Sequence, residues 1–378
     1  MIETVDIAPG WTVSRIAKGN WQLAAKHGAA YERDAAIADM RAYVEAGITL
    51  FDCADHYVGV EELIGEFRRR YPEHARRIRI STKLVPDHES LARLTRADLE
   101  KIVDTSLARL GQERLDLVQF HWWDYRVPGY VQAMHWMKDI QAAGKIELIG
   151  TTNFDTARLR EIVDSGVPVA TNQLQYSALD HRPERGMAEL CMRHGIRMLA
   201  YGAVAGGFLS QRWLGAPDPS PPFAIRSLVK YRLIIEDFGG WERFQALLQA
   251  MDRIAKRHRV SLAGVATRYL LDKPGMAVAI VGAHGAAHLR DTLEVFDLKL
   301  DAADRAAIAD IAAAAPGPLG DCYELERVEG GAHSSIMWKN QNTRGTPADA
   351  AYANAPPEYG KGGRPAAAPA NPPREKNG

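Results

Sequence analysis

The chain has 378 residues, of which 46% are hydrophobic and 25% charged, a composition typical of a globular protein with a sizeable core. Its 47 basic and 47 acidic side chains cancel, so charge points to neither nucleic acid nor a membrane surface as a partner. No apolar run approaches the ~20 residues needed to span a bilayer, and the N-terminus does not read as a secretory signal. Three cysteines without CxxC spacing, Cys53, Cys191 and Cys322, indicate a reducing compartment and no metal site, so we expect a cytoplasmic protein.

Taken in chain order, short β-rich runs alternate with amphipathic helical segments from about residue 15 onward. One such segment, TRADLEKIVDTSLARLG, begins with Thr95 as an N-cap residue and ends with Gly111. The pattern predicts strands at 16–19, 48–52, 78–83, 115–121, 146–151, 169–173, 196–201 and 278–281. Such repeated units predict a (β/α)₈ TIM barrel over residues 1–340. A doubly wound open sheet is the alternative, but no GxGxxG opens the first helix.

Three segments depart from the repeating unit. Near the N-terminus, VDIAPGWTV predicts a hairpin that plugs the bottom of the barrel. Residues 205–240, which contain PDPSPP and FGG, predict a long insertion after strand seven, a candidate flap. Residues 341–378 form a Pro/Ala/Gly-rich tail that we expect to be disordered, because residues 345–378 contain no Leu, Ile, Val, Phe, Met or Trp.

Four polar residues fall at the ends of predicted strands or in the loops that follow them: Asp52, Tyr57, Lys83 and His121. Asp52 and His121 each share a strand face with apolar residues lower in the same strand. The alternation therefore places them at the top of the barrel, where barrel active sites are built.

These side chains suit carbonyl reduction, in which hydride transfer creates an alkoxide that needs a proton. A tyrosine hydroxyl has an ordinary pKa of ~10, and a nearby ammonium is expected to lower it. We therefore interpret Tyr57 as the proton donor, Lys83 as the cation that tunes it, and Asp52 as the carboxylate that holds Lys83. His121 would bind and orient the substrate oxygen.

In order and spacing, the four residues match the catalytic tetrad of the aldo-keto reductases, and the chain resembles that family from residue 1 to about 300. The resemblance implies a barrel that uses a nicotinamide coenzyme to interconvert aldehydes or ketones and alcohols. The segment GTTNF at 150–154 is similar to the family's G-V-S-N-F element, which implies that Thr152 and Asn153 bind the nicotinamide carboxamide. By the same resemblance, Gln173 in NQLQY is a third carboxamide contact, and Tyr201 in LAYGAVAGG stacks on the nicotinamide ring.

The last predicted strand and its helix, AIVGAHGAAHLRDTLEVFDL, resemble the family's segment for the phosphate end of the coenzyme. This likeness implies coenzyme contacts from Gly282, His288, Asp291 and Thr292. Members that bind a 2′-phosphate usually place Lys, Ser or Arg here, whereas Arg290 is the nearest strong cation in this chain. The family favours NADP(H), and NAD(H) stays open.

An aromatic pocket for flat or apolar carbonyl compounds is predicted from Trp21 and Trp122, with the alternation allowing only one of Trp122 and Trp123 to face the pocket. Two other classes of function are considered. Some proteins that resemble this family are redox-sensing subunits of membrane channels. If this chain had such a role, the sequence would not identify its protein partner. A barrel isomerase or lyase would leave the GTTNF, Gln173 and Tyr201 set unexplained.

Overall fold

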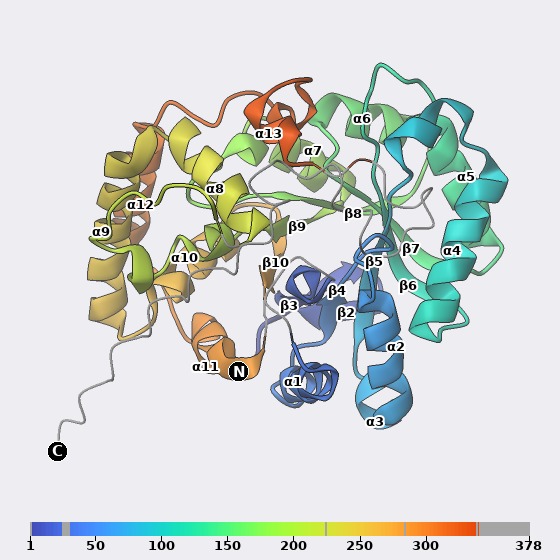
Figure 1. Ribbon diagram of the computed structural model, residues 1–378, viewed down its shortest axis with the longest axis horizontal. Coiled ribbons are helices and arrows are strands. Elements are labelled where there is room, and N and C mark those ends of the chain that lie inside the picture. Colours follow the sequence, from blue (N-terminus) through green and yellow to red (C-terminus); the bar gives the residue numbers. More distant parts are fainter. Residues whose placement is uncertain (1, 25–30, 224, 283–284, 338, 340–378) are drawn as a thin grey trace.

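The computed structural model describes residues 2–24, 31–223, 225–282, 285–337 and 339. Within these residues, eight parallel strands form a closed barrel in which each strand pairs with the next along the chain and the last pairs with the first (Figure 1). The strands are β3 (Ile16–Gly19), β4 (Leu50–Asp52), β5 (Arg79–Leu84), β6 (Leu115–Phe120), β7 (Ile146–Thr152), β8 (Val169–Gln175), β9 (Arg197–Tyr201) and β10 (Met276–Gly282). The predicted TIM barrel is confirmed; the predicted tail, 341–378, lies outside the described residues.

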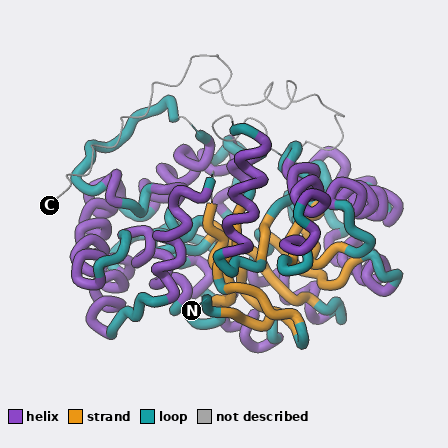
Figure 2. The backbone as a smooth tube through the Cα atoms, turned by 90° about the horizontal axis from the view of Figure 1, so that it is seen from below, coloured by secondary structure: helices purple, strands orange, loops and turns teal. Residues whose placement is uncertain are grey.

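Helices surround the barrel (Figure 2). They are α1 (Arg33–Glu45), α2 (Val60–Arg70), α3 (Pro72–Ala75), α4 (Arg96–Leu110), α5 (Tyr130–Ala142), α6 (Thr156–Asp164), α7 (Met187–His194), α8 (Arg226–Asp237), α9 (Gly240–His258), α10 (Leu262–Leu271), α11 (Leu289–Leu293), α12 (Ala302–Ala313) and α13 (Ala332–Ser335). Helix α4 begins and ends as predicted, with a capping box between Thr95 and Asp98 and with Gly111 at φ 62°. None of the described helices is long and apolar enough to cross a membrane.

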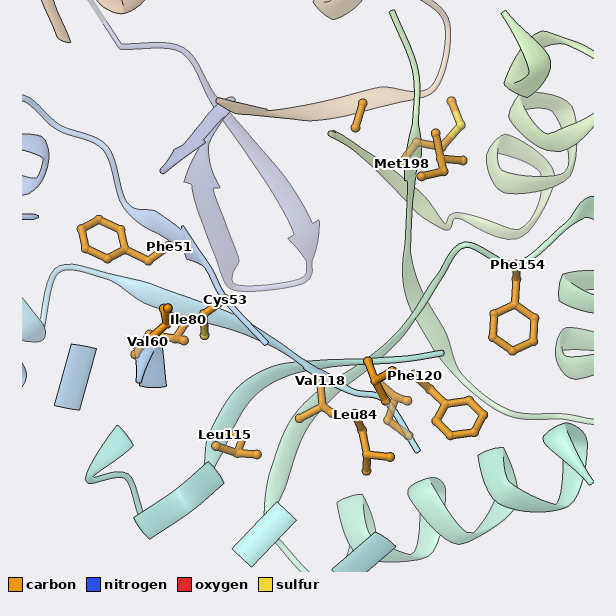
Figure 3. Packing of buried hydrophobic residues seen from close by; sticks show 14 of the residues in the cluster. Phe51, Cys53, Val60, Ile80, Leu84, Leu115, Val118, Phe120, Phe154 and Met198 are labelled. Atoms are coloured by element: carbon orange, nitrogen blue, oxygen red, sulfur yellow. The ribbon is translucent and has the colours of Figure 1, made fainter. Parts of the chain in front are cut away.

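The larger part of the core lies between the outer face of the barrel and the helices (Figure 3). Phe51, Ile80 and Val118, on three successive strands, are almost completely buried in this layer. Cys53 belongs to the same layer, and burial raises its thiol pKa well above the ordinary value, so the side chain is an inert core residue. Burying side chains of this size stabilises the fold by about 1.5–3 kcal/mol each.

The N-terminal end of the barrel is closed by the predicted hairpin, β1 (Thr4–Ala8) and β2 (Trp11–Ser14). Trp11 and Val13 of the hairpin share a buried cluster with Leu50 and Val278, which belong to barrel strands. Because this end is filled by apolar side chains, access to the barrel interior is left to the opposite end, where the strands terminate at their carboxyl ends.

The predicted insertion follows β9. It contains two 3₁₀ turns, η4 (Ala205–Gly207) and η5 (Gln211–Trp213), and then α8. The Tyr231 ring of α8 packs so closely on Gly202 and Gly206 that a Cβ at either glycine would overlap it. This contact fixes α8 beside the end of β9.

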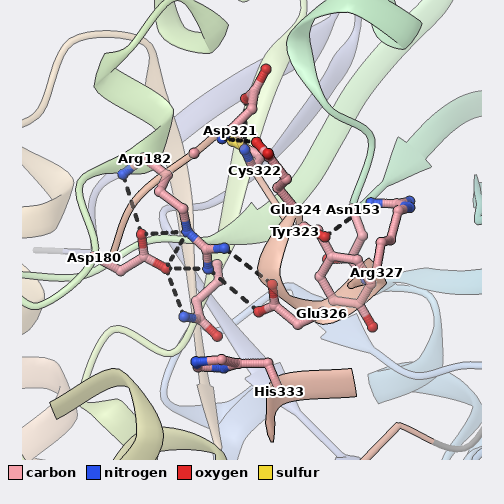
Figure 4. Close-up of polar contacts among 12 residues, drawn as sticks. Asn153, Asp180, Arg182, Asp321, Cys322, Tyr323, Glu324, Glu326, Arg327 and His333 are labelled. Carbon is pink, nitrogen blue, oxygen red and sulfur yellow. Dashed lines mark hydrogen bonds and ion pairs between the residues drawn. The ribbon is translucent and has the colours of Figure 1, made fainter. Parts of the chain in front are cut away.

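Residues 316–337 and 339, here called the segment 316–339, follow the last barrel helix and contribute Tyr323, Ile336 and Met337 to the cavity at the carboxyl ends of the strands, an arrangement that the sequence did not predict. Arg182 anchors this segment: it donates to Asp180 at 2.7 Å and to Glu326 at 3.0 Å, and all three side chains are almost completely buried (Figure 4). Farther along, the Lys339 carbonyl accepts a backbone hydrogen bond of 2.7 Å from His88. The segment is thus tied to the barrel at two places.

The anchor predicts a stability effect. Glu326→Ala should lower the free energy of unfolding by about 3 kcal/mol, because it removes one partner of a buried guanidinium. Urea denaturation at pH 7 measures this change. The control is Glu329→Ala, which removes a carboxylate that is 78% exposed and should change stability by less than ~1 kcal/mol. Equal, small effects of the two substitutions would contradict the anchor.

The pH dependence of this effect follows from the Glu326 carboxyl. Burial opposes its ionisation, but the charges of Arg182 and Lys230 outweigh burial and lower the pKa to about 2. An unfolded glutamate has a pKa of about 4.3. The contribution of Glu326 should therefore be complete above pH 4.3 and disappear as pH falls toward 2, so wild type and Glu326→Ala should converge in acid.

Candidate active site

A cavity of about 780 Å³ opens at the carboxyl ends of the barrel strands. Thirteen of the fourteen site residues predicted from the sequence line it: Trp21, Asp52, Tyr57, Lys83, His121, Thr152, Asn153, Gln173, Tyr201, Gly282, His288, Asp291 and Thr292. Among the described residues there is no cluster of three or more His, Cys, Asp or Glu side chains that could hold a metal ion.

At the base of the cavity, Asp52 and Lys83 form a buried ion pair on neighbouring strands. Asp52 of β4 pairs in register with Ser81 of β5, and Lys83 lies two residues farther on, so it points to the same face as Ser81. The Lys83 ammonium donates to both Asp52 carboxylate oxygens at 2.9 Å and to the Cys53 carbonyl at 2.8 Å. Gln173 donates a further hydrogen bond of 2.7 Å to the carboxylate.

The ammonium is held charged by this arrangement. Burial opposes its charge, but Asp52 and Tyr57 outweigh burial and raise the pKa of Lys83 above its ordinary value. Tyr57 follows β4, and its ring centroid lies 5.1 Å from the Lys83 nitrogen. Burial raises the pKa of the Tyr57 hydroxyl to about 12, while Lys83 acts in the opposite direction. The predicted effect of Lys83 is present, but the expected net lowering is wrong because desolvation is larger. Tyr57 is therefore protonated at neutral pH.

His121 is neutral in this environment. Burial, together with the positive charge of Arg327, lowers its imidazole pKa well below the ordinary value. Its Nδ1 lies 3.1 Å from the Thr152 carbonyl oxygen, which can only accept a hydrogen bond, so Nδ1 carries the proton. Its Nε2 is buried without a partner among the described residues and is left as an acceptor.

The aromatic wall beside His121 differs from the prediction. Trp123 lines the cavity, with its ring edge-on to His121 at 4.3 Å between centroids, and Tyr323 approaches to 5.5 Å. Trp122, the predicted residue, does not line the cavity. Its indole donates to the Asp124 carbonyl at 2.9 Å, and its side chain packs in the layer between barrel and helices. The prediction for Trp122 is wrong because the alternation of β6 continues past the strand and turns Trp122 outward.

At the ends of β7 and β8, next to His121, three side chains keep polar groups free in a combination that fits a primary carboxamide. The Thr152 hydroxyl is buried without a partner among the described residues. Asn153 accepts from the Tyr201 hydroxyl at 2.8 Å, which leaves its amide nitrogen to donate. Gln173 uses its nitrogen on Asp52, which leaves its amide oxygen to accept. One donor, one acceptor and one hydroxyl complement the amide group of a nicotinamide.

The distal end of the cavity holds the other predicted coenzyme residues. A Cβ at Gly282 would meet only the flexible end of the Gln22 side chain, which also lines the cavity. His288 is 86% exposed and lies 3.7 Å from Asp291, and the Arg290 side chain is 91% exposed and does not line the cavity. Thus neither His288 nor Arg290 is held in a buried cation site.

Sequence reasoning missed several residues of the cavity wall. Arg226 and Lys230 come from α8, and their i, i+4 spacing in RSLVKYR was the only local signal. Tyr323, Ile336 and Met337 come from the segment 316–339, which carries no motif that would place it over the barrel.

The carboxyl end of this closed parallel barrel thus holds a tyrosine, a buried lysine–aspartate pair and a set of free polar groups whose pattern complements a carboxamide. The sequence pattern of the Aldo/keto reductase family matches residues 15–313. The chain belongs to this family.

Individual relatives are distant. The chain is 28% identical to the aldo-keto reductase YhdN of Bacillus subtilis, over 78% of this chain and 89% of that protein. It is 27% identical to a putative aryl-alcohol dehydrogenase of Schizosaccharomyces pombe, over 70% and 81% of the two chains. It is 29% identical to flagellar radial spoke protein 5 of Chlamydomonas reinhardtii, but the match spans only 49% of that protein. A solved thermostable aldo-keto reductase in complex with the inhibitor epalrestat has the same fold, with a TM-score of 0.65 at 24% identity, over 82% of this chain and 100% of that chain.

The contact between His121 and Thr152 predicts the behaviour of the imidazole. In NMR spectra of the histidine side chains, His121 should stay neutral with its proton on Nδ1 and should show no titration midpoint near the ordinary pKa of about 6.5. His194, the last residue of α7 and exposed to solvent, provides the comparison spectrum. A midpoint near 6.5 for His121 would contradict the desolvation argument.

Proposed function

We propose that the protein is an oxidoreductase that uses a nicotinamide coenzyme to reduce aldehydes or ketones to alcohols, with Tyr57 as the proton donor. The observation that carries this proposal is the buried Asp52–Lys83 pair, which lies 5.1 Å from the Tyr57 ring in the same cavity as the carboxamide-binding wall. A cytoplasmic setting is part of the proposal.

Binding of the coenzyme would use the wall on β7, β8 and β9. Thr152, Asn153 and Gln173 would hold the carboxamide, and Tyr201 would stack on the ring. When bound, the nicotinamide supplies the hydride. Fixing the carboxamide by three polar contacts also fixes which face of the ring meets the substrate.

The chain's own residues would manage the proton. Tyr57 gives its hydroxyl proton to the oxygen that becomes the alcohol, and the Lys83 ammonium stabilises the phenolate left behind. Asp52 keeps that ammonium in place through two hydrogen bonds. Once the alcohol has formed, its hydroxyl can donate to the free Nε2 of His121, which helps to orient the oxygen.

The walls near the proton donor favour flat carbonyl compounds. Trp123 and Tyr323 flank His121, and Trp21 lines the same cavity. Aromatic walls with few polar groups suit an aromatic or other flat aldehyde. The name of the aryl-alcohol dehydrogenase relative supports this substrate class.

A redox-sensing subunit of a channel-like partner is the alternative, and it predicts the same coenzyme cavity. Turnover separates the two roles. A reductase converts aldehyde and coenzyme repeatedly, whereas a sensor binds the coenzyme tightly with turnover too slow to matter. Steady-state oxidation of NADPH by purified protein with aromatic aldehydes makes this distinction.

The proton-donor role predicts a selective loss in Tyr57→Phe. Its kcat for aldehyde reduction should fall by at least ~10², the usual scale for loss of a general acid. Coenzyme affinity, followed by tryptophan fluorescence, should stay within a few-fold of wild type. Tyr71→Phe is the matched control, because Tyr71 lies at the end of α2 and outside the cavity. Unchanged turnover in Tyr57→Phe would remove Tyr57 from this role.

Coenzyme preference is expected to be modest. The family favours NADPH, but the exposed His288 and Arg290 offer no fixed partner for a 2′-phosphate. We predict that NADPH binds more tightly than NADH by no more than roughly tens-fold in Kd. Fluorescence titrations with both coenzymes measure the ratio, and Arg290→Ala should weaken NADPH more than NADH. Tighter binding of NADH to wild type would overturn the assignment.

A further inference from the structure

Lys230 is a buried ammonium that faces the cavity without a carboxylate partner. It lies on α8, is 8% exposed and lines the same cavity as the tetrad. Its nitrogen is 3.4 Å from the Tyr201 hydroxyl and 4.6 Å from the centroid of that ring. The rings of Tyr231 and Tyr323 lie at 5.9 and 5.8 Å. Within the described residues it makes no ion pair, which is unusual because buried lysines are normally paired.

The charges that surround Lys230 compensate it only in part. Burial lowers its pKa to about 8, with Glu326 and Asp180 acting against burial and Arg182 acting with it. Both carboxylates are already bonded to the Arg182 guanidinium. Lys230 is therefore largely charged at neutral pH, and an additional anion beside it would be stabilising.

The cavity as a whole carries an excess of positive charge among the described residues. Asp52 and Lys83 neutralise each other, and the remaining lining charges are Arg212, Arg226 and Lys230 against the single carboxylate of Asp291. Around Lys230 the neighbours are aromatic rings, which lower the local dielectric and strengthen the attraction between the ammonium and a negatively charged ligand.

Tyr323 links Lys230 to the reaction centre. Its ring contacts the His121 ring at 5.5 Å and the Lys230 nitrogen at 5.8 Å. A substrate whose carbonyl lies beside His121 and Tyr57 can therefore extend along the Tyr323 ring toward the Lys230 ammonium.

We infer that Lys230 binds an anionic group of the substrate, a carboxylate or a phosphate, carried at the end of the substrate away from the reacting carbonyl. This inference rests on the proposed function and narrows its substrate class from flat carbonyl compounds to anionic ones. Charge-assisted hydrogen bonds to a buried ammonium favour an anion over a neutral group of the same shape.

Matched substrates test the inference. The kcat/KM values for 4-carboxybenzaldehyde, 4-formylphenyl phosphate and the neutral ester methyl 4-formylbenzoate are measured with saturating NADPH. Wild type should prefer at least one anionic aldehyde over the ester. Lys230→Met should reduce that preference by about 10-fold or more, mainly through KM, as expected for loss of a charged hydrogen bond. Lys230→Arg should retain most of it. The two anionic substrates show whether carboxylate or phosphate fits better.

Controls separate this role from others. Lys138→Met removes an exposed ammonium on α5, far from the cavity lining, and should leave the preference unchanged. Thermal melting verifies that Lys230→Met folds. Equal kcat/KM for acid, phosphate and ester in wild type would overturn the inference, even though reduction of the ester would leave the proposed function intact. A large loss of NADPH affinity with unchanged substrate preference would also overturn it, because Lys230 would then serve the coenzyme.

Failure of the proposed function gives a different result. If wild type reduces none of the three aldehydes, their equilibrium binding is compared by calorimetry. Tighter binding of an anionic aldehyde than of the ester, lost in Lys230→Met, supports the anion site without a reductase. Equal binding of anionic and neutral compounds overturns it.

Discussion

The buried ion pair between Asp52 and Lys83 is the interaction on which the rest of the site depends. Removing two charges from water costs several kcal/mol for each ion. The attraction between the charges offsets this cost only if the geometry is excellent and the remaining polar atoms are satisfied. Here the Lys83 ammonium donates to both carboxylate oxygens of Asp52 and to the Cys53 carbonyl, and the Gln173 amide donates a further hydrogen bond to the carboxylate. Hydrophobic residues could fill this space at equal or better stability, so the pair is better explained by the charge it holds beside Tyr57.

The same burial determines which groups carry protons. Tyr57 keeps its proton at neutral pH because its pKa is about 12, and His121 stays neutral with a free acceptor. Reduction of a carbonyl needs a group that gives up a proton, and the protonated Tyr57 hydroxyl would supply that proton in the proposed function. Oxidation of an alcohol would need the phenolate, which is scarce at pH 7. Under the proposed function, burial of Tyr57 therefore favours reduction near neutrality, whereas oxidation would be faster under alkaline conditions.

Local patterns allowed the barrel and most of the site to be predicted. Alternation within a strand places Asp52 on the cavity face. This alternation can be read from the residues of that strand alone, without knowledge of distant contacts. Followed two residues past His121, the same alternation would have selected Trp123 rather than Trp122. The pKa of Tyr57 was predicted from its charged neighbours, but the amount of surface buried around it is a property of the whole fold.

The segment 316–339 could not be predicted from local patterns, because its anchor joins Glu326 to Arg182 across 144 residues of sequence. A single ion pair between distant segments leaves no periodic signal. The match to the family ends at residue 313, so Tyr323 and Ile336 lie outside it although they line the cavity. The proposed proton donor and carboxamide contacts all lie inside the match. The family resemblance therefore indicates the type of reaction proposed here. Part of the cavity wall comes from residues that the family match does not cover. Only the folded structure shows that these residues and the matched residues line the same cavity.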